Sequence, residues 1–250
     1  MADHFAKIMT ARLVAVVGDQ ASAVRRMQRY SAWTSVLAAG VIKMRCRRVN
    51  DIGKFLSPDS IGWDPGTFES VSMSPAPLAM QPTEYVRNSW QGKEYGAIRA
   101  LHVAAVHDGR AWAIRAAGMS ISPPHGDFPD AFAIALPVRG NPVLALMGSE
   151  EAPIHYLRWA ANKDGVRSVL ATGIGTSQPG PPMQCHAAAQ KTHDQWQIVI
   201  KRPLNVGLPG ARLTAGAKTG IGFAVWHGGN DERAGIKAFS IDWTELALEA

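Results

Sequence analysis

The sequence is poor in cysteine and lacks the common nucleotide-binding, metalloprotease and hydrolase signatures. Its 250 residues include only two cysteines, Cys46 and Cys185, which are too far apart for a Cys-x-x-Cys pair. Two isolated cysteines make neither a zinc ribbon nor a disulfide framework. Gly-x-Gly-x-x-Gly, phosphate-loop, His-Glu-x-x-His and Gly-x-Ser-x-Gly patterns are all missing. These absences argue against a nucleotide-dependent enzyme and against a hydrolase.

Covalent haem attachment is also excluded. Cys185-His186 has the ending of a c-type haem attachment motif, but the motif needs another cysteine at position 182, where Pro182 stands. Any haem in this protein would therefore be held by coordination and packing alone.

Positive charge is concentrated near the N-terminus. The formal net charge is +6, and residues 1–48 hold nine basic side chains against two acidic ones. The rest of the chain holds 17 basic and 18 acidic groups. Binding to nucleic acid needs Lys and Arg clustered on one face, so we expect no nucleic-acid partner.

Residues 30–42 form an apolar stretch that follows several arginines and superficially resembles a signal peptide. The stretch lies far from the start and is followed by the basic segment 43–48 instead of a small-residue cleavage site. It is also too short to span a membrane. We therefore expect no membrane span here.

The sequence predicts two parts, an N-terminal extension over residues 1–43 and a domain over residues 44–250. We expect the extension to be poorly ordered or weakly helical. Two alternatives stay open: a degraded export signal, or an early assigned start with Met27 or Met44 as the true first residue.

From residue 49 onward the pattern favours short strands joined by turns, with 24 Gly and 16 Pro in the whole chain. Asp108-Gly109 lies between the apolar runs Ala97–Val106 and Ala111–Arg115, which is a strong hairpin signal. Further candidate strands are Ala131–Val138, Val143–Met147, Gln195–Lys201, Gly220–Trp226 and Lys237–Leu248. The predicted fold is mostly β: an antiparallel β-sandwich with a few short helices, preceded by the extension.

No two of the eight histidines have metal-ligand spacing. His102 is predicted to be a core histidine and His107, beside the Asp-Gly turn, a solvated one. His155, His186 and His193 are interpreted as surface residues. The sequence itself therefore indicates no histidine metal site.

Several segments gain meaning when they are taken together and in order. They are Pro77–Arg87, the His107-Asp108-Gly109 turn, Asp127–Ala133, Leu146–Ser149 with Pro153, Tyr156–Trp159 and Phe223–Ser240. From about Met44 to the C-terminus, this series resembles the haem-binding gamma subunit of ethylbenzene dehydrogenase and its relatives in the type II dimethyl sulfoxide reductase family. Those relatives include dimethylsulfide dehydrogenase, selenate reductase, chlorate reductase and steroid C25 dehydrogenase.

The resemblance implies a β-sandwich that holds one haem b between a Met and a Lys as axial ligands of the iron. The matching residues are Met147, in a Met-Gly pair, and Lys237, in a Gly-x-Lys-x-x-Ser segment. Without the resemblance, Met147 would be read as a core residue and Lys237 as a surface lysine.

Ligand chemistry is compatible with this pair. A thioether is a soft, neutral ligand that stabilises ferrous iron and raises the potential of a haem. Lysine coordinates only as the free amine, so burial or the iron itself must overcome its normal pKa near 10.4. The apolar neighbours of Lys237, Gly235-Ile236 before it and Ala238-Phe239 after it, are compatible with either.

Further contacts to the haem are hypotheses. The aromatic residues Phe132, Trp159, Trp226 and Phe239 are candidates for packing against the ring. The basic residues Arg158, Lys191 and Arg202 are candidates for binding the propionates.

The resemblance implies a non-catalytic electron-transfer subunit of a molybdenum-containing oxidoreductase. In such a heterotrimer, an alpha subunit carries the molybdopterin cofactor and a beta subunit carries iron–sulfur clusters. The gamma subunit passes single electrons between those clusters and an external carrier such as a cytochrome c. Relatives work in the periplasm, and a cytoplasmic location is the alternative. The substrate of the complex is not encoded in this chain.

A function of another class stays open. A non-haem β-sandwich that binds carbohydrate or another ligand through exposed aromatic residues is compatible with the eight tryptophans.

Overall fold

The computed structural model describes residues 43–122 and 127–250, and this part of the chain is mostly β. The predicted extension lies outside the described residues except for Lys43, so the domain boundary stays a prediction. Within residues 43–122 and 127–250, no helix is both long and apolar enough to cross a membrane.

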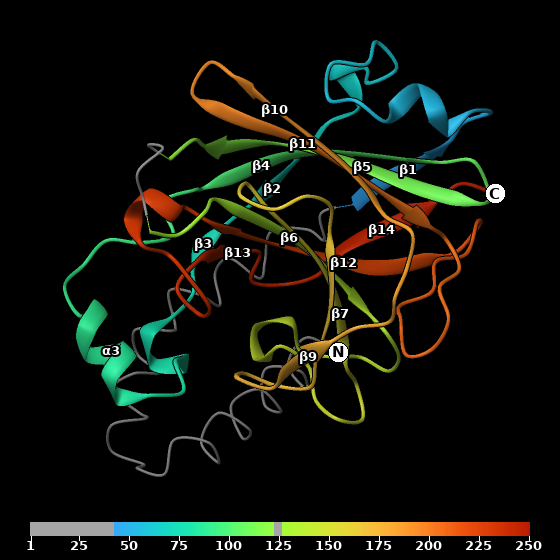
Figure 1. Cartoon of the computed structure of the whole chain (residues 1–250). Helices are drawn as coiled ribbons and strands as arrows, with labels where there is room; N and C mark the ends of the chain where they lie inside the picture. The colour runs from blue at the N-terminus through green and yellow to red at the C-terminus, as the bar shows by residue number, and fades with distance from the viewer. Residues whose placement is uncertain (1–42, 123–126) are drawn as a thin grey trace. The chain divides into compact units, whose positions relative to one another are not determined.

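The strands are short and are joined by turns and a few short helices (Figure 1). The strands are β1 (Lys43–Arg48), β2 (Glu69–Ser72), β3 (Ser74–Pro75), β4 (Ala100–His107), β5 (Ala111–Ser120), β6 (Ala131–Pro137), β7 (Ile154–Ala160), β8 (Arg167–Ala171), β9 (Ser177–Pro179), β10 (His186–Thr192), β11 (Gln195–Pro203), β12 (Lys218–Trp226), β13 (Ala238–Phe239) and β14 (Thr244–Leu248). The helices are α3 (Glu84–Trp90) and the 3-10 turns η2 (Ile52–Phe55), η3 (Pro65–Thr67), η4 (Leu78–Met80), η5 (Leu144–Leu146) and η6 (Gly228–Asn230).

One continuous path of pairings, β10-β11-β5-β4-β1-β14-β12-β6-β7-β8-β9, forms both layers of the sandwich. Strand β12 belongs to both layers. Its first half, Lys218–Ile221, pairs with β14, and its second half, Gly222–Trp226, pairs with β6. The predicted β-sandwich is confirmed.

Strand β1 adds two parallel pairings to a sheet whose other pairings are antiparallel. It lies between β4 and β14 in the first layer, which runs from β10 to the first half of β12. The second layer runs from the second half of β12 to β9. The predicted hairpin is present on one side of β1, where β4 pairs with β5 through His102↔Ala117 to His107↔Trp112.

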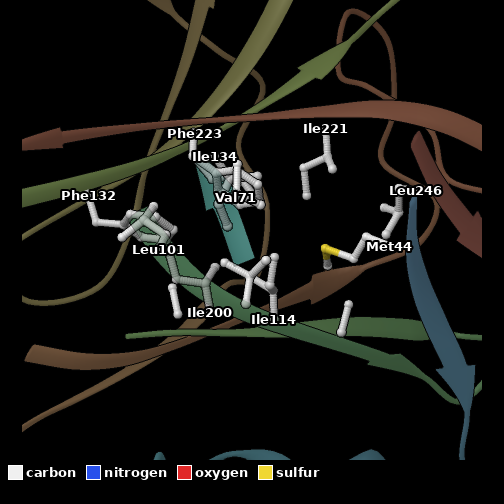
Figure 2. Close-up of a cluster of buried hydrophobic side chains, with 14 of the residues drawn as sticks. Met44, Val71, Leu101, Ile114, Phe132, Ile134, Ile200, Ile221, Phe223 and Leu246 are labelled. Atoms are coloured by element: carbon white, nitrogen blue, oxygen red, sulfur yellow. The ribbon is translucent and has the colours of Figure 1, made fainter. Parts of the chain in front are cut away.

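The core lies between the layers because alternate residues of each strand point to the same face. Figure 2 shows Ile221 and Phe223 of β12 facing Leu101 of β4, Ile114 of β5 and Ile200 of β11 across this space. All five side chains are buried. Burial of apolar side chains such as these, at about 25 cal/mol per Å² of apolar surface, is the main favourable contribution to folding.

Two predicted strands differ from the structure. Val143–Met147 contains the 3-10 turn η5 instead of a strand, and Lys237–Leu248 is divided into β13 and β14. Short apolar runs do not distinguish a strand from a buried helical turn. In Lys237–Leu248, residues 240–243 form a non-strand connection between β13 and β14.

Three histidine assignments were wrong. His107 is fully buried because it pairs with Arg48 of β1 as well as with Trp112. His102 is exposed on the outer face of β4, whose inner face carries Leu101. His155 is buried on the inner face of β7.

His155 is held as the neutral imidazole. The backbone N–H of Ala211 donates to its Nδ1 at 3.1 Å, so the ring proton is on Nε2, which lies 3.0 Å from the Oγ of Ser168. Burial, and to a smaller extent the charge of Arg202, lowers the pKa of His155 to about 4. The fold therefore favours the unprotonated form.

This environment predicts an acid-sensitive fold. Since the folded-state pKa lies below the unfolded value of about 6.5, protons bind preferentially to the unfolded chain. The free energy of unfolding should be fully retained above pH 6.5 and fall by about 3 kcal/mol as the pH drops towards 4. Urea titrations at several pH values measure this. His155→Gln should flatten the slope, whereas His186→Gln, at an exposed position, should keep it; equal slopes in both variants would contradict the assignment.

Candidate functional site

Met147 and Lys237 are 90 positions apart in the sequence and lie in contact in the structure. The Nζ of Lys237 is 3.9 Å from the Sδ of Met147. Met147 follows the η5 turn, and Lys237 immediately precedes β13. The structure therefore brings the two predicted ligands together.

Met147 has an unusual backbone conformation. It is left-handed, with φ 58° and ψ 31°, and its N–H donates to Leu144 O at the end of η5. Gly148 follows with φ 85°, and a Cβ there would lie 2.8 Å from Ala152 O. A non-glycine residue in this region costs about 1–3 kcal/mol. Met147 is such a residue, and in this conformation its side chain contacts Lys237.

The backbone of Lys237 is fixed by distant segments. Its carbonyl accepts a hydrogen bond from the N–H of Ala76 at 2.9 Å, just after β3. The side-chain amide of Gln81 donates to Gly235 O at 3.1 Å. A Cβ on Gly235 would lie 1.8 Å from the Gln81 Oε1, so a larger residue at this position would displace the Gln81 side chain. The Pro77–Arg87 segment thus positions the lysine.

The amine of Lys237 is buried without a counter-ion. The residue is 8% exposed, and its Nζ lies 5.3 Å from the centroid of the Trp226 ring. No carboxylate in residues 43–122 or 127–250 forms an ion pair with it. Because burial disfavours the ammonium, the pKa of Lys237 is lowered to about 8.

The outer face of the second layer is lined with very small side chains. Strand β6 alternates large residues, which face the core, with Ala131, Ala133 and Ala135, which face outward and are buried. Directly opposite them on β12 are Gly222 and Ala224. We call these five residues the alanine floor. Trp226 continues the same face at the end of β12, opposite Ala131.

The predicted aromatic contacts divide into two pairs. Trp226 and Phe239 lie on the outer face with the alanine floor. Phe132 and Trp159 point into the core, where Phe132 stacks on Phe223 and Trp159 makes an edge contact with Trp196. Strand alternation thus places Phe132 and Trp159 on the opposite face of their strands from Ala133 and Arg158, away from Trp226 and Phe239.

The three basic residues predicted to bind the propionates lie in different parts of the fold. The Cζ of Arg158 lies 5.4 Å from the centroid of the Trp226 ring, which the Lys237 amine also contacts. Lys191 lies over Trp196 on the edge hairpin of the other layer. Arg202 is fully buried inside the sandwich and donates to Ala211 O. Only Arg158 is at the site.

The alanine floor was missed in the sequence, although Ala131-Phe-Ala-Ile-Ala-Leu136 shows the alternation plainly. An apolar run with small residues at every second position indicates a strand whose outer face is also covered.

Within the described ranges, no group of three or more His, Cys, Asp or Glu side chains could hold a metal ion.

The Met147–Lys237 contact places two donors of different kinds, a thioether and an amine, 3.9 Å apart. With a pKa near 8 instead of 10.5, removing the amine proton at pH 7 costs about 1.4 kcal/mol instead of about 4.8 kcal/mol. A thioether and an unprotonated amine are both donors that iron accepts, so this pair would suit a bound iron cofactor.

Two curated proteins similar to this chain are named as reductase subunits. The chain is 37% identical over 139 residues to the chlorate reductase subunit gamma of Ideonella dechloratans, covering 54% of this chain and 57% of that protein. It is 31% identical over 135 residues to a Haloferax mediterranei protein named as a respiratory nitrate reductase haem subunit, covering 53% and 48%. The matches thus span about half the length of these relatives. No family model matches the chain.

Two solved structures match the chain at low similarity. One is a family 9 carbohydrate-binding module from Caldicellulosiruptor kristjanssonii with glucose, at 10% identity, TM-score 0.36 and coverage of 72% of this chain and 94% of that one. The other is a Bacteroides uniformis protein described as carbohydrate-binding, at 10% identity, TM-score 0.42 and coverage of 84% and 100%.

The buried amine should reduce the stability of the ligand-free protein. Its pKa of about 8, against 10.5 for an ordinary lysine, corresponds to a cost of about 3 kcal/mol at neutral pH. Lys237→Met keeps the packing volume and removes the charge, so the free energy of unfolding at pH 7 should rise by about 1–3 kcal/mol. Lys218→Met, at an exposed ion pair with Glu245, should change it by less than about 1 kcal/mol. Chemical denaturation measures both; a less stable Lys237→Met protein would contradict this reading.

Proposed function

We propose that this chain is a haem b electron-transfer subunit in which Met147 and Lys237 are the axial ligands of the iron. The observation that carries the proposal is the 3.9 Å contact between a thioether and a buried amine that has no carboxylate partner among the described residues. The names of the two curated relatives, a reductase gamma subunit and a haem subunit, support the same class.

Each side chain has a distinct role in this proposal. Lys237 releases its proton and offers the amine lone pair, which its buried position already favours. Met147 offers a soft, neutral sulfur, which favours the reduced form. The bound haem supplies one-electron transfer through its iron.

The surrounding residues position the cofactor and exclude water. The alanine floor presents only Cβ and Cα atoms, so a planar ring would lie close to β6 and β12. Leu144, which packs over Gly222 and against Ala135, would have to move for the ring to cover that end of the floor. Trp226 is fixed by its Nε1–H, which donates to Ala234 O at 3.0 Å. A dry, low-dielectric setting of this kind raises the potential further, because it disfavours the added charge of ferric iron.

The proposal extends to the complex in which the chain works. We propose that the chain has no catalytic residues of its own and works in a complex with a molybdopterin-containing alpha subunit and an iron–sulfur beta subunit. It would relay single electrons between those clusters and a carrier such as a cytochrome c, in the periplasm. The gamma-subunit name of the chlorate reductase relative supports a multisubunit complex.

Substitution of the two ligands tests the assignment. Met147→Leu and Lys237→Leu remove one donor each at similar volume, so the Soret and α bands should change and the haem should dissociate roughly tenfold faster or more. Loss of the thioether should also lower the midpoint potential, since sulfur stabilises ferrous iron. Absorption spectra, haem-transfer kinetics and redox titration measure these effects.

Matched controls are available in the chain. Met119→Leu alters a buried core methionine and Lys218→Leu an exposed lysine, and both should keep the wild-type spectrum. Unchanged spectra in both ligand variants would overturn the proposal. A colourless protein that binds a glycan, from cells supplied with haem, would favour the carbohydrate-binding alternative.

A further inference from the structure

Two arginines lie opposite each other on neighbouring strands beside the site. Arg158 of β7 pairs in register with Arg167 of β8. Side chains at directly opposite positions of an antiparallel pair point to the same face, and like charges placed there are destabilising. The pair is therefore unfavourable unless negative charge is brought to it.

Arg158 lacks such a partner within the protein. It is only partly exposed, and within residues 43–122 and 127–250 it makes no hydrogen bond or ion pair. Burial, followed by the charge of Arg167, lowers the pKa of its guanidinium. Arg115, by contrast, has a comparable setting but donates to Pro58 O and to the side chain of Gln197. The donors of Arg158 are available to a ligand.

The position of Arg158 is continuous with the proposed haem site. It lies opposite Ala133 of β6, which lies opposite Ala224 of β12. These are members of the alanine floor. The Arg158 guanidinium and the Lys237 amine lie 5.4 Å and 5.3 Å from the same Trp226 ring centroid. One row of side chains thus runs from the floor to the arginine pair.

Tyr156 extends the set of free donors. It is two residues before Arg158, so it points to the same outer face of β7, and its hydroxyl makes no hydrogen bond to any described residue. Burial raises the pKa of this phenol, so it stays a neutral donor. Together the two side chains present a cation and a hydroxyl at one border of the floor.

We propose that Arg158, with Arg167 beside it and Tyr156 next along the strand, binds the propionate carboxylates of the haem held by Met147 and Lys237. This inference rests on the proposed function. A guanidinium binds a carboxylate through two parallel hydrogen bonds, which are stronger than neutral ones. Because the haem is not covalently attached, this contact would add to the retention provided by Met147 and Lys237 and would fix the orientation of the ring.

The test compares haem b with its dimethyl ester, in which the propionates carry no charge. The full chain is loaded with each, and the rate of transfer to an excess of apomyoglobin is measured. Wild-type protein should hold haem b roughly ten- to a hundredfold longer than the ester. Arg158→Gln should accelerate loss of haem b by a similar factor and leave the ester unchanged.

Two further variants control the comparison. Arg158→Lys keeps the charge without the two-pronged geometry and should restore part of the preference. Arg110→Gln removes the same charge from an exposed position in the β4–β5 turn and should change neither rate. If Arg158→Gln fails to fold, the wild-type preference for haem b over the ester and the Arg158→Lys rates still decide the question.

Failure of this inference is distinguishable from failure of the proposed function. If haem b and the ester leave at equal rates while Met147→Leu and Lys237→Leu still alter the spectrum, the propionate site is wrong and the axial pair stands. If Arg158→Gln changes both rates equally, its role is structural and the inference is overturned. The inference is likewise overturned if Arg158→Gln weakens only the binding of a partner protein. If the chain binds no haem, both proposals fall.

Discussion

The structure depends on β12 pairing with both layers of the sandwich. Its first half closes the layer that contains β14 and β1, and its second half begins the layer that contains β6 and β7. The change of partner occurs between two glycines. A Cβ on Gly220 would lie 2.9 Å from the Trp243 ring, and one on Gly222 would lie 2.5 Å from a Leu144 methyl. Close approach on the outer face is possible because these positions carry no side chain.

The same strand connects the fold to the site. Its outer face provides part of the alanine floor and ends at Trp226, and the loop that follows returns to Lys237. The η5 turn that ends at Met147 begins with Leu144, which packs over Gly222. The positions of both proposed ligands therefore follow from how β12 is covered, and neither requires a catalytic cleft.

Much of the fold could be predicted from local sequence, because hairpin turns and strand alternation are local properties. The Asp108-Gly109 hairpin and the strands now called β11 and β12 were found in this way. The η5 turn was not, because a five-residue apolar run is ambiguous between strand and helix. The exposure of His102 and the burial of His107 depend on which strands pair with β4, and that is a tertiary property. The contact between Met147 and Lys237 spans 90 positions, so spacing alone contains no trace of it; the expectation came from the resemblance.

The unpaired amine of Lys237 has a consequence for the life of the protein in the cell. A side chain that destabilises the empty fold and stabilises the loaded one makes folding stability a function of cofactor supply, by mass action. A chain made in excess of its cofactor would spend more time unfolded and be removed faster by proteases. On the proposed function, the same lysine that binds iron would also limit the lifetime of molecules that have not received it, and so match the amount of subunit to the haem available.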